Sequence, residues 1–331
     1  MELEEFRERL VPFVRTHFDD PLARVVSVEK GPGHAGFSYL FDVETRGEVR
    51  SYFLRMPPPG VKLEGTADVM RQVAALKALD KTDVPHAPVL WSGEDPQWFG
   101  RPYFVQPRID GDVLRGEWLE QFDEAQRRDM ARQAMTALAG IHRVDPSEVP
   151  YLGDFWGFEF DITRWDRFYE RAAEPQYLAL QPRVRQLLLD KIPANARIGL
   201  YHGDYQWGNL MYSREGKLLA VIDWELCGVG ATLNDVGWIC AFNEPEAWAH
   251  PGAMAAKMPH GDELEEMYRE AWGDDLGDIR WFKALAMYKF AIITGLNLSL
   301  HRRGKRHDPH WEVMAPSMQS NMEYALKMLT G

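Results

Sequence analysis

A short polar stretch most constrains what this chain can fold into. It reads HGDYQWGNL at residues 202–210 and is soon followed by VIDWE at residues 221–225. Asp204 precedes Asn209 by five residues, which leaves no room for a separate element between them. The residues just before Asp223 form a short, mainly apolar run that is typical of a buried strand. We therefore expect these three polar side chains on two loops, the second of which follows that strand.

Oxygen-bearing side chains in this arrangement suit phosphoryl transfer. The reaction needs a carboxylate that orients the attacking hydroxyl and accepts its proton, and oxygen ligands that hold Mg²⁺ against the phosphates. Asp204 fits the base, and Asn209 with Asp223 fits the metal site. The alternative is that these residues only cap turns.

At these positions the chain resembles the aminoglycoside phosphotransferase-like family. The catalytic loop of that family reads His-Gly-Asp, four residues, Asn, and its metal aspartate follows on the next strand. The chain is most similar to the branch related to the phosphotransferase domains found with acyl-CoA dehydrogenases, because AVIDWEL from Ala220 and DVGW from Asp235 stand in the same order. The resemblance covers most of the chain. It implies ATP and Mg²⁺ as cofactors and an α+β, bilobal, protein-kinase-like fold, with a small antiparallel-sheet N-lobe and a larger, mainly helical C-lobe.

Length and charge limit the possible partners. With 331 residues the chain is long enough for two lobes, each with its own core. A formal net charge of −12 argues against nucleic acid and an anionic membrane surface, since both would repel the average protein surface. The same charge mildly favours a cationic substrate.

Several features predict a cytoplasmic protein without a membrane partner. The two cysteines, Cys227 and Cys240, are too few for a disulfide framework. The first residues, MELEEF, carry acids where a signal peptide needs a basic start. The longest apolar candidate for a membrane span is interrupted by polar residues such as Lys289 and Asn297.

The N-terminal part of the chain is expected to form a helix followed by an antiparallel meander. Apolar residues from Leu3 to Val14 recur at helical spacing. Three β-rich runs follow at residues 24–29, 38–43 and 49–56, joined by glycine-containing turns.

Gly31, Gly33 and Gly36 form a literal Gly-x-Gly-x-x-Gly pattern between the first two of these strands. A dinucleotide-binding fingerprint would need a helix directly after its glycines. The residues after Gly36 are β-rich instead, so we interpret the run as a glycine-rich hairpin over the phosphates of ATP. A plain flexible turn is the alternative.

By resemblance, Arg55 stands where kinases carry the lysine of the third strand. A guanidinium can bind the α and β phosphate oxygens with two hydrogen bonds. The next helix, expected at residues 66–79, usually offers a glutamate to this basic residue in the family, and the matching position here is Gln72. An amide supplies a hydrogen bond but no ion pair, so Asp68, one turn earlier, is the alternative anchor.

Two further strands are expected at residues 89–91 and 102–105, followed by a hinge. By resemblance, Gln106 and Arg108 of the hinge belong to the nucleotide site, where backbone groups would meet the adenine edge. The hinge divides the chain into an ATP-binding N-lobe, residues 1–107, and a C-lobe, residues 108–331, which carries the catalytic loop, the metal site and the substrate-binding helices.

Beyond the hinge the apolar pattern is mainly helical. It predicts a central helix at residues 123–144, in which His142 is a packed core histidine. Shorter helical runs lie at residues 160–174 and 184–192, and by resemblance they wall the substrate cleft. Three closing helices are expected at residues 264–272, 281–300 and 313–329.

Asp235 resembles the family aspartate that braces the catalytic loop, although capping of the helix that it begins would explain it equally well. Three classes of function are compatible with these residues. The favoured class is an ATP- and Mg²⁺-dependent phosphotransferase acting on a hydroxyl of a small molecule. A metallohydrolase using His202, Asp204 and His142 is a second class, although the resemblance implies that His202 holds the catalytic loop. A nucleotide-binding module without catalysis is the third, because Gln72 and Gln206 depart from the family pattern.

The acceptor is the least determined part of the site. The candidate substrate residues are Gln206, Trp207, Glu225 and Trp238. An aminoglycoside would want acids near the cleft, for which the candidates are Glu225, Asp235, Glu244 and Glu246; Trp156, Trp165, Trp207 and Trp238 would suit a more apolar acceptor. The branch resemblance favours a metabolic hydroxyl compound. The basic run from Arg302 to Arg306 is either a solvated loop or a contact for an anionic group, such as a substrate phosphate or a coenzyme A tail.

Overall fold

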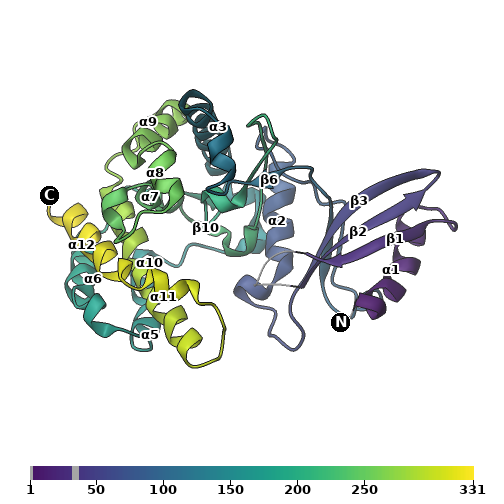
Figure 1. Cartoon of the computed structure of the whole chain (residues 1–331), viewed down its shortest axis with the longest axis horizontal. Coiled ribbons are helices and arrows are strands. Elements are labelled where there is room, and N and C mark those ends of the chain that lie inside the picture. The colour runs from purple at the N-terminus through teal and green to yellow at the C-terminus, as the bar shows by residue number, and fades with distance from the viewer. Residues whose placement is uncertain (1–2, 32–36) are drawn as a thin grey trace.

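Two hydrophobic cores divide the chain between a small sheet-based lobe and a larger helical lobe (Figure 1). The computed structural model describes residues 3–31 and 37–331. The expected α+β arrangement of a small antiparallel sheet and a mainly helical second lobe is confirmed. None of the described helices is both long and apolar enough to cross a membrane.

The smaller lobe is a five-stranded antiparallel sheet in the order β1-β2-β3-β5-β4. Helix α1 (Leu3–His17) covers one face of it, and Phe6 on this helix stacks on Tyr39 of the sheet with 3.9 Å between ring centroids. The helix and the first three strands lie close to their expected positions. The strands are β1 (Arg24–Lys30), β2 (Phe37–Thr45), β3 (Glu48–Met56), β4 (Trp91–Gly93) and β5 (Tyr103–Pro107).

Helix α2 (Val69–Leu79) precedes the last strands of the sheet in sequence but packs against the larger lobe. Asp68 caps it by accepting a hydrogen bond from the backbone N–H of Met70 at 3.0 Å, which places the start of the helix later than expected. Arg71 donates to the carbonyl oxygens of Leu152 and Cys227, at 3.2 and 3.1 Å. Figure 1 shows α2 at the junction of the lobes. Its buried apolar residues belong to the larger core: Val69, Val73, Ala75, Leu76, Ala78 and Leu79.

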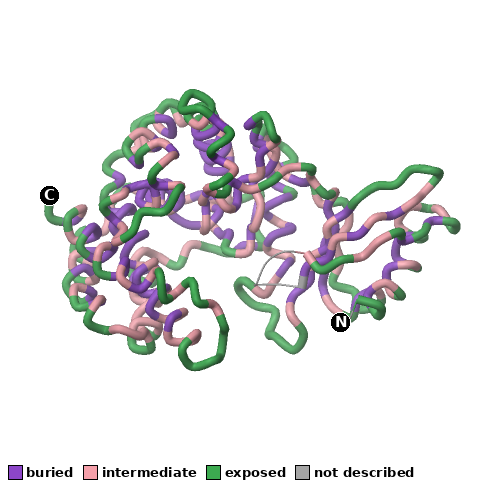
Figure 2. The backbone as a smooth tube through the Cα atoms, in the orientation of Figure 1, coloured by how far each residue is buried: buried purple, intermediate pink, exposed green. Residues whose placement is uncertain are grey.

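The larger lobe is built around α3 (Glu124–His142), the expected central helix. Asp123 caps this helix through a reciprocal pair of hydrogen bonds with Gln126. Figure 2 shows that buried backbone is concentrated in the interior of this lobe, whereas its peripheral loops are exposed. The other helices described are α4 (Phe158–Thr163), α5 (Asp166–Tyr169), α6 (Gln181–Asp190), α7 (Leu233–Phe242), α8 (Ala253–Lys257), α9 (Gly261–Trp272), α10 (Arg280–Arg302), α11 (His310–Met314) and α12 (Ser317–Thr330).

Two expected helices are in fact interrupted. The run at residues 160–174 forms the short helices α4 and α5, and the run at residues 313–329 is divided between α11 and α12. Pro316 stands at the second break, as the cap of α12. A proline has no N–H to donate and clashes with the preceding turn, so the start of a helix is a more favourable position for it than the interior.

Two small sheets position the polar stretch found in the sequence. Strand β7 (Ile198–Tyr201) leads into residues 202–209, named the catalytic loop here after its resemblance, and pairs with β10 (Gly228–Ala231). Strands β6 (Asp112–Val113), β8 (Leu210–Tyr212) and β9 (Leu218–Val221) form the other sheet, in the order β6-β8-β9. The backbone N–H of Ile222 donates to the carbonyl oxygen of Asn209 at 2.9 Å. Asn209 and Asp223 therefore lie at the same end of the β8–β9 pair.

Candidate active site

The carboxylate of Asp204 is held from two sides. Its Oδ2 accepts a hydrogen bond from Asn209 Nδ2 at 3.0 Å, and its Oδ1 accepts one from Trp238 Nε1 at 3.1 Å. Burial raises the pKa of Asp204 and the charge of Asp223 adds to the rise, while His202 and the two hydrogen bonds oppose it. A carboxylate with a fixed orientation and a raised pKa is suited to accept a proton from a bound hydroxyl.

Asp235 braces the catalytic loop, as the resemblance implied. Its buried carboxylate accepts hydrogen bonds from the backbone N–H groups of His202 and Gly203, at 2.6 and 2.8 Å. It also lies 3.2 Å from Nε2 of His142, whose other ring nitrogen lies 2.7 Å from the hydroxyl of Tyr268. His142 is fully buried, so its assignment as a core histidine is confirmed. The side chain of Asp235 does not cap helix α7.

His202 and Gly203 join the catalytic loop to the segment that carries Asp223. Nε2 of His202 lies 2.9 Å from the carbonyl oxygen of Ile222, the residue just before Asp223. Gly203 has a φ of +91°, and a Cβ atom there would stand 2.3 Å from the carbonyl oxygen of Leu226. Any other residue would be strained and would clash with main chain, so this position requires glycine.

Asn209 and Asp223 offer oxygen atoms that suit a hard cation. Nδ2 of Asn209 donates to both the backbone and the side chain of Asp204, which leaves its Oδ1 without a hydrogen-bond partner among the described residues. Asp223 has a φ of +60°, an uncommon conformation for a residue other than glycine. Burial raises the pKa of Glu225, and the charge of Asp223 adds to this rise. A cation would relieve the repulsion in this group of acids, and an amide and a carboxylate oxygen are donors that Mg²⁺ prefers.

Arg55 is anchored by a residue that the sequence did not indicate for this role. Its guanidinium forms an ion pair of 2.5 Å with Glu225 and a second one of 3.3 Å with Asp223. The expected pairing with Gln72 or Asp68 is therefore wrong. Gln72 is only 2% exposed and its Nε2 finds no hydrogen-bond partner within residues 3–31 and 37–331, while Asp68 is engaged in capping α2.

The two elements that flank the glycine run are antiparallel strands, whereas a dinucleotide-binding fingerprint would be followed by a helix. Lys30 of β1 pairs with Tyr39 of the antiparallel strand β2, and the backbone N–H of Gly31 donates to the carbonyl oxygen of Ser38 at 2.8 Å. Gly33 and Gly36 lie outside the described residues. The contact of this hairpin with phosphates stays a prediction.

The two hinge residues have different surroundings. The side chain of Gln106 is buried, and its Nε2 donates to the carbonyl oxygen of Ala87 at 2.5 Å, so this side chain serves the fold. Arg108 is exposed and lies 3.4 Å from Glu29. A contact of either residue with the nucleotide stays a prediction.

The four candidate substrate residues fall into different places. Trp238 and Glu225 line cavities, but Glu225 is engaged by Arg55. Gln206 caps the short helical turn Trp207–Asn209 by accepting a hydrogen bond from the backbone N–H of Gly208 at 2.7 Å. Trp207 is buried, donates to Asn243 Oδ1 at 3.0 Å, and lines neither cavity, so the expectation that it contacts the acceptor is not supported.

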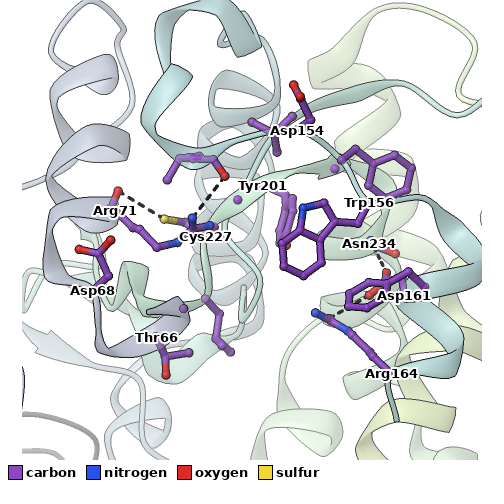
Figure 3. A pocket seen from close by; sticks show the side chains of 18 of the residues that line it. Thr66, Asp68, Arg71, Asp154, Trp156, Asp161, Arg164, Tyr201, Cys227 and Asn234 are labelled. Atoms are coloured by element: carbon purple, nitrogen blue, oxygen red, sulfur yellow. Dashed lines mark hydrogen bonds and ion pairs between the residues drawn. The ribbon is translucent and has the colours of Figure 1, made fainter. Parts of the chain in front are cut away.

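Two adjoining cavities lie in this region, and Asp204 lines one of them. The smaller, of about 300 Å³, is lined by Asp204 itself, Trp238 and Lys289 among others. The larger, of about 700 Å³, extends toward α2 and is shown in Figure 3. Asp161 stands between Arg164 and Asn234, with which it interacts at 2.8 and 3.2 Å. Both cavities are lined by Asp161, Arg164, Tyr201, Leu226 and Asn234.

Most of these cavity residues carry no motif in the sequence. Lys289 did give a signal, because it is a lysine inside the apolar pattern of α10, but that pattern alone does not indicate which cavity the side chain lines.

The arrangement does not favour the metallohydrolase alternative. The rings of His142 and His202 are engaged in holding the loop, as described above. Within residues 3–31 and 37–331, the one cluster of histidine and carboxylate ligand atoms close enough for a metal is Glu244, His260 and Asp262. The ammonium group of Lys283 forms ion pairs with Glu244 and Asp262, at 3.3 and 2.8 Å, which explains why these acids gather there.

Solved structures share this fold. A Ralstonia eutropha protein provisionally named an aminoglycoside phosphotransferase is 25% identical, with a TM-score of 0.79 over 97% of this chain and 98% of that one. The GDP complex of aminoglycoside 2'-phosphotransferase-IIIa has a TM-score of 0.66 at 14% identity, over 97% and 99% of the two chains. A thermostable mutant of an aminoglycoside phosphotransferase, solved with ADP and hygromycin B, has a TM-score of 0.60 at 15% identity, over 97% and 99%.

Sequence comparisons identify both a relative and a family. The Arabidopsis thaliana protein named probable acyl-CoA dehydrogenase IBR3 is 27% identical over 224 residues, which make up 63% of this chain. The match spans only 27% of the length of that relative. The family model described as the phosphotransferase enzyme family matches residues 32–282, which is well over half of the chain. The chain therefore belongs to the phosphotransferase enzyme family.

Proposed function

We propose that this protein transfers the γ-phosphoryl group of ATP, with Mg²⁺, to a hydroxyl group of a small molecule. The observation that carries the proposal is the carboxylate of Asp204, which is held by Asn209 and Trp238 at the wall of a cavity of about 300 Å³. Asp223 lies on the neighbouring segment. The GDP and ADP complexes of two proteins with the same fold support a nucleotide as the donor.

The residues divide the chemistry between them. Asp204 accepts a hydrogen bond from the acceptor hydroxyl and takes up its proton as the new oxygen–phosphorus bond forms. The bond between the γ-phosphorus and the bridging oxygen breaks, and ADP leaves with that electron pair. Arg55 neutralises phosphate oxygens while Glu225 keeps its guanidinium oriented. Asn209 Oδ1 and Asp223 would hold Mg²⁺, which supplies charge neutralisation at the phosphates when bound.

Substitution of the base tests this assignment. Asp204→Asn should lower turnover by about 10²–10⁴-fold, because it removes the proton acceptor, while nucleotide binding is retained. ADP release with a panel of hydroxyl acceptors measures the first effect, and calorimetry with Mg²⁺ and a non-hydrolysable ATP analogue measures the second. An Asp204→Asn variant that phosphorylates a confirmed acceptor at the parent rate would contradict the proposal.

Substitution of the proposed metal ligand is a second test. In the same calorimetric assay the Asp223→Ala variant should lose the Mg²⁺-dependent part of its affinity for the ATP analogue.

No second function is favoured by a specific observation. The idea of a non-catalytic module rested on Gln72 and Gln206, which depart from the family pattern. Gln206 caps a turn of the catalytic loop, and Arg55 has its ion pair with Glu225 in place of a helix glutamate. Neither departure removes a group that the proposed chemistry needs.

A further inference from the structure

The four acids that the sequence suggested for a cationic acceptor are engaged by groups of the protein. Glu225 is paired with Arg55, and Asp235 is buried under the catalytic loop. Glu244 is buried beside Lys283, and Glu246 is paired with Lys327 at the surface. Asp161 lines both cavities but is paired with Arg164 and bonded to Asn234 (Figure 3).

Lys289 contrasts with these groups, because its ammonium forms no ion pair with any residue that the structure describes. It lines the smaller cavity from α10, and its ammonium lies 5.8 Å from the ring centroid of Trp238. The same indole donates its N–H to Asp204, so one aromatic ring separates Lys289 from the proposed base. In the part of the chain that the structure describes, no carboxylate forms an ion pair with Lys289.

Another lysine of helix α10 is buried, but its ammonium has carboxylate partners. Lys283 has ion pairs with Glu244, Asp262 and Glu265, at 3.3, 2.8 and 3.4 Å. Burial lowers the pKa of Lys289, whereas the pKa of Lys283 is raised despite its burial. A partly buried cation without a counter-ion carries a desolvation penalty, which an anion in the cavity would offset.

We propose that the acceptor is a hydroxy compound that also carries an oxyanion, a carboxylate in the simplest case, and that Lys289 pairs with this group while the hydroxyl lies at Asp204. This inference rests on the proposed function, since it names the chemical class of the acceptor. It makes Lys289 a specificity residue. The cavity of about 300 Å³ is at the small end of ligand sites, and an acceptor with a longer arm would extend into the adjoining one.

The test uses acceptors that share one carbon frame and differ in charge. The smallest such set is 3-hydroxybutyrate, 3-hydroxybutyramide and 4-aminobutan-2-ol, and 3-hydroxybutyl phosphate extends it to a phosphate oxyanion. Longer members of each series are then assayed in the same way. We expect kcat/KM for ADP release to be about tenfold or more higher for an anionic member than for the amide, because a charge-assisted hydrogen bond is stronger than a neutral one. The amine should be the poorest acceptor.

Variants at Lys289 separate recognition from packing. Lys289→Met should bring the ratio of acid to amide close to one, chiefly through a rise in KM for the acid. Lys289→Arg should retain the preference. Lys217→Met removes one exposed positive charge that lines neither cavity and should change nothing. Since Lys289→Met removes a cation without a counter-ion, the variant should fold at least as stably as the parent.

Calorimetric titration with the same compounds, without nucleotide, tests the inference apart from turnover. Lys289-dependent binding of the acid without Asp204-dependent ADP release would support the inference and overturn the proposed phosphotransfer. Asp204-dependent phosphorylation of amides or amino alcohols in preference to anions would overturn the inference and leave the phosphotransfer standing. An acid-to-amide ratio that Lys289→Met does not change, or no tighter binding of any anion than of its amide, would also overturn the inference.

Discussion

Arg55 is held by a carboxylate that lies 170 residues later in the chain. Glu225 comes two positions after Asp223, so the anchor of the proposed phosphate-binding residue and the proposed metal ligand belong to one short segment. The guanidinium is largely shielded from water, and so is the Glu225 carboxylate. The orientation of Arg55 therefore depends on the larger lobe and not on helix α2.

Substitution of Glu225 tests this dependence. Glu225→Gln should raise the Michaelis constant for ATP by about threefold to tenfold, because the charged anchor of Arg55 is replaced by a neutral one. Asp68→Asn should leave that constant unchanged. Gln72→Glu should also leave it unchanged but lower the free energy of unfolding by about 2 kcal/mol or more, since a carboxylate would be buried without a partner. Steady-state kinetics and urea denaturation provide the measurements. A clear effect of Asp68→Asn without one from Glu225→Gln would contradict the assignment.

At the scale of elements, three helices meet at a buried polar junction. His142 of α3 contacts Tyr268 of α9 and Asp235 of α7, which in turn holds the catalytic loop. Burial lowers the pKa of His142 from its ordinary value of 6.5. The histidine is therefore neutral in the folded protein at neutral pH.

This junction predicts a loss of stability in mild acid. Below about pH 6.5 the unfolded chain binds a proton at His142 that the folded protein does not, so the free energy of unfolding falls as the pH decreases. One such group contributes a slope of at most about 1.4 kcal/mol per pH unit. Urea denaturation midpoints measured between about pH 7 and pH 5 should show this fall. The fall should be smaller in His142→Gln but not in His310→Gln, which changes an exposed histidine. An identical pH dependence in His142→Gln and the parent would contradict the role of this histidine.

The elements that were predicted well are those whose pattern is local. Periodic apolar residues gave α1, α3 and α10, and the spacing of Asp204 and Asn209 gave the catalytic loop. Strands β6, β8 and β10 have two to four residues each, too few for a pattern to emerge.

The missed parts of the site depend on contacts between distant segments. The ion pair of Arg55 with Glu225 joins the two lobes, and no spacing in the sequence indicates it. Lys289 and Asp161 meet at one cavity from different helices, α10 and α4. Such neighbours are decided by tertiary packing, which residue spacing along one segment does not specify.

For the molecule as a whole, the boundary between cores differs from the boundary in sequence. A division after residue 107 assigns α2 to the N-lobe, yet its apolar face belongs to the larger core and Arg71 bonds to Leu152 and Cys227. The core of the sheet is formed instead by α1 and strands of the sheet.

Hydrogen exchange can distinguish the two groupings. Amides of α2 should exchange within about tenfold of the rates of α3, because both helices belong to one core, and more slowly than amides of β1. Arg71→Met should increase exchange in α2 and leave α1 unchanged, since α1 packs in the other core. If the amides of α2 exchanged at the rates of the sheet and not at the rates of α3, the helix would open together with the smaller lobe.

The close main-chain contact at Gly203 limits which parts of the site can change during evolution. The segment that bears Asp204 touches the segment that bears Asp223 through main-chain atoms, with no room for a Cβ atom between them. The spacing between the proposed base and the proposed metal ligand is thus set by backbone, whereas the proposed acceptor cavity is lined largely by side chains such as Lys289, Trp238 and Asp161. Substitutions in those walls can exchange one alcohol for another without altering that spacing. New specificities can therefore arise in this scaffold while the phosphoryl-transfer chemistry is inherited unchanged.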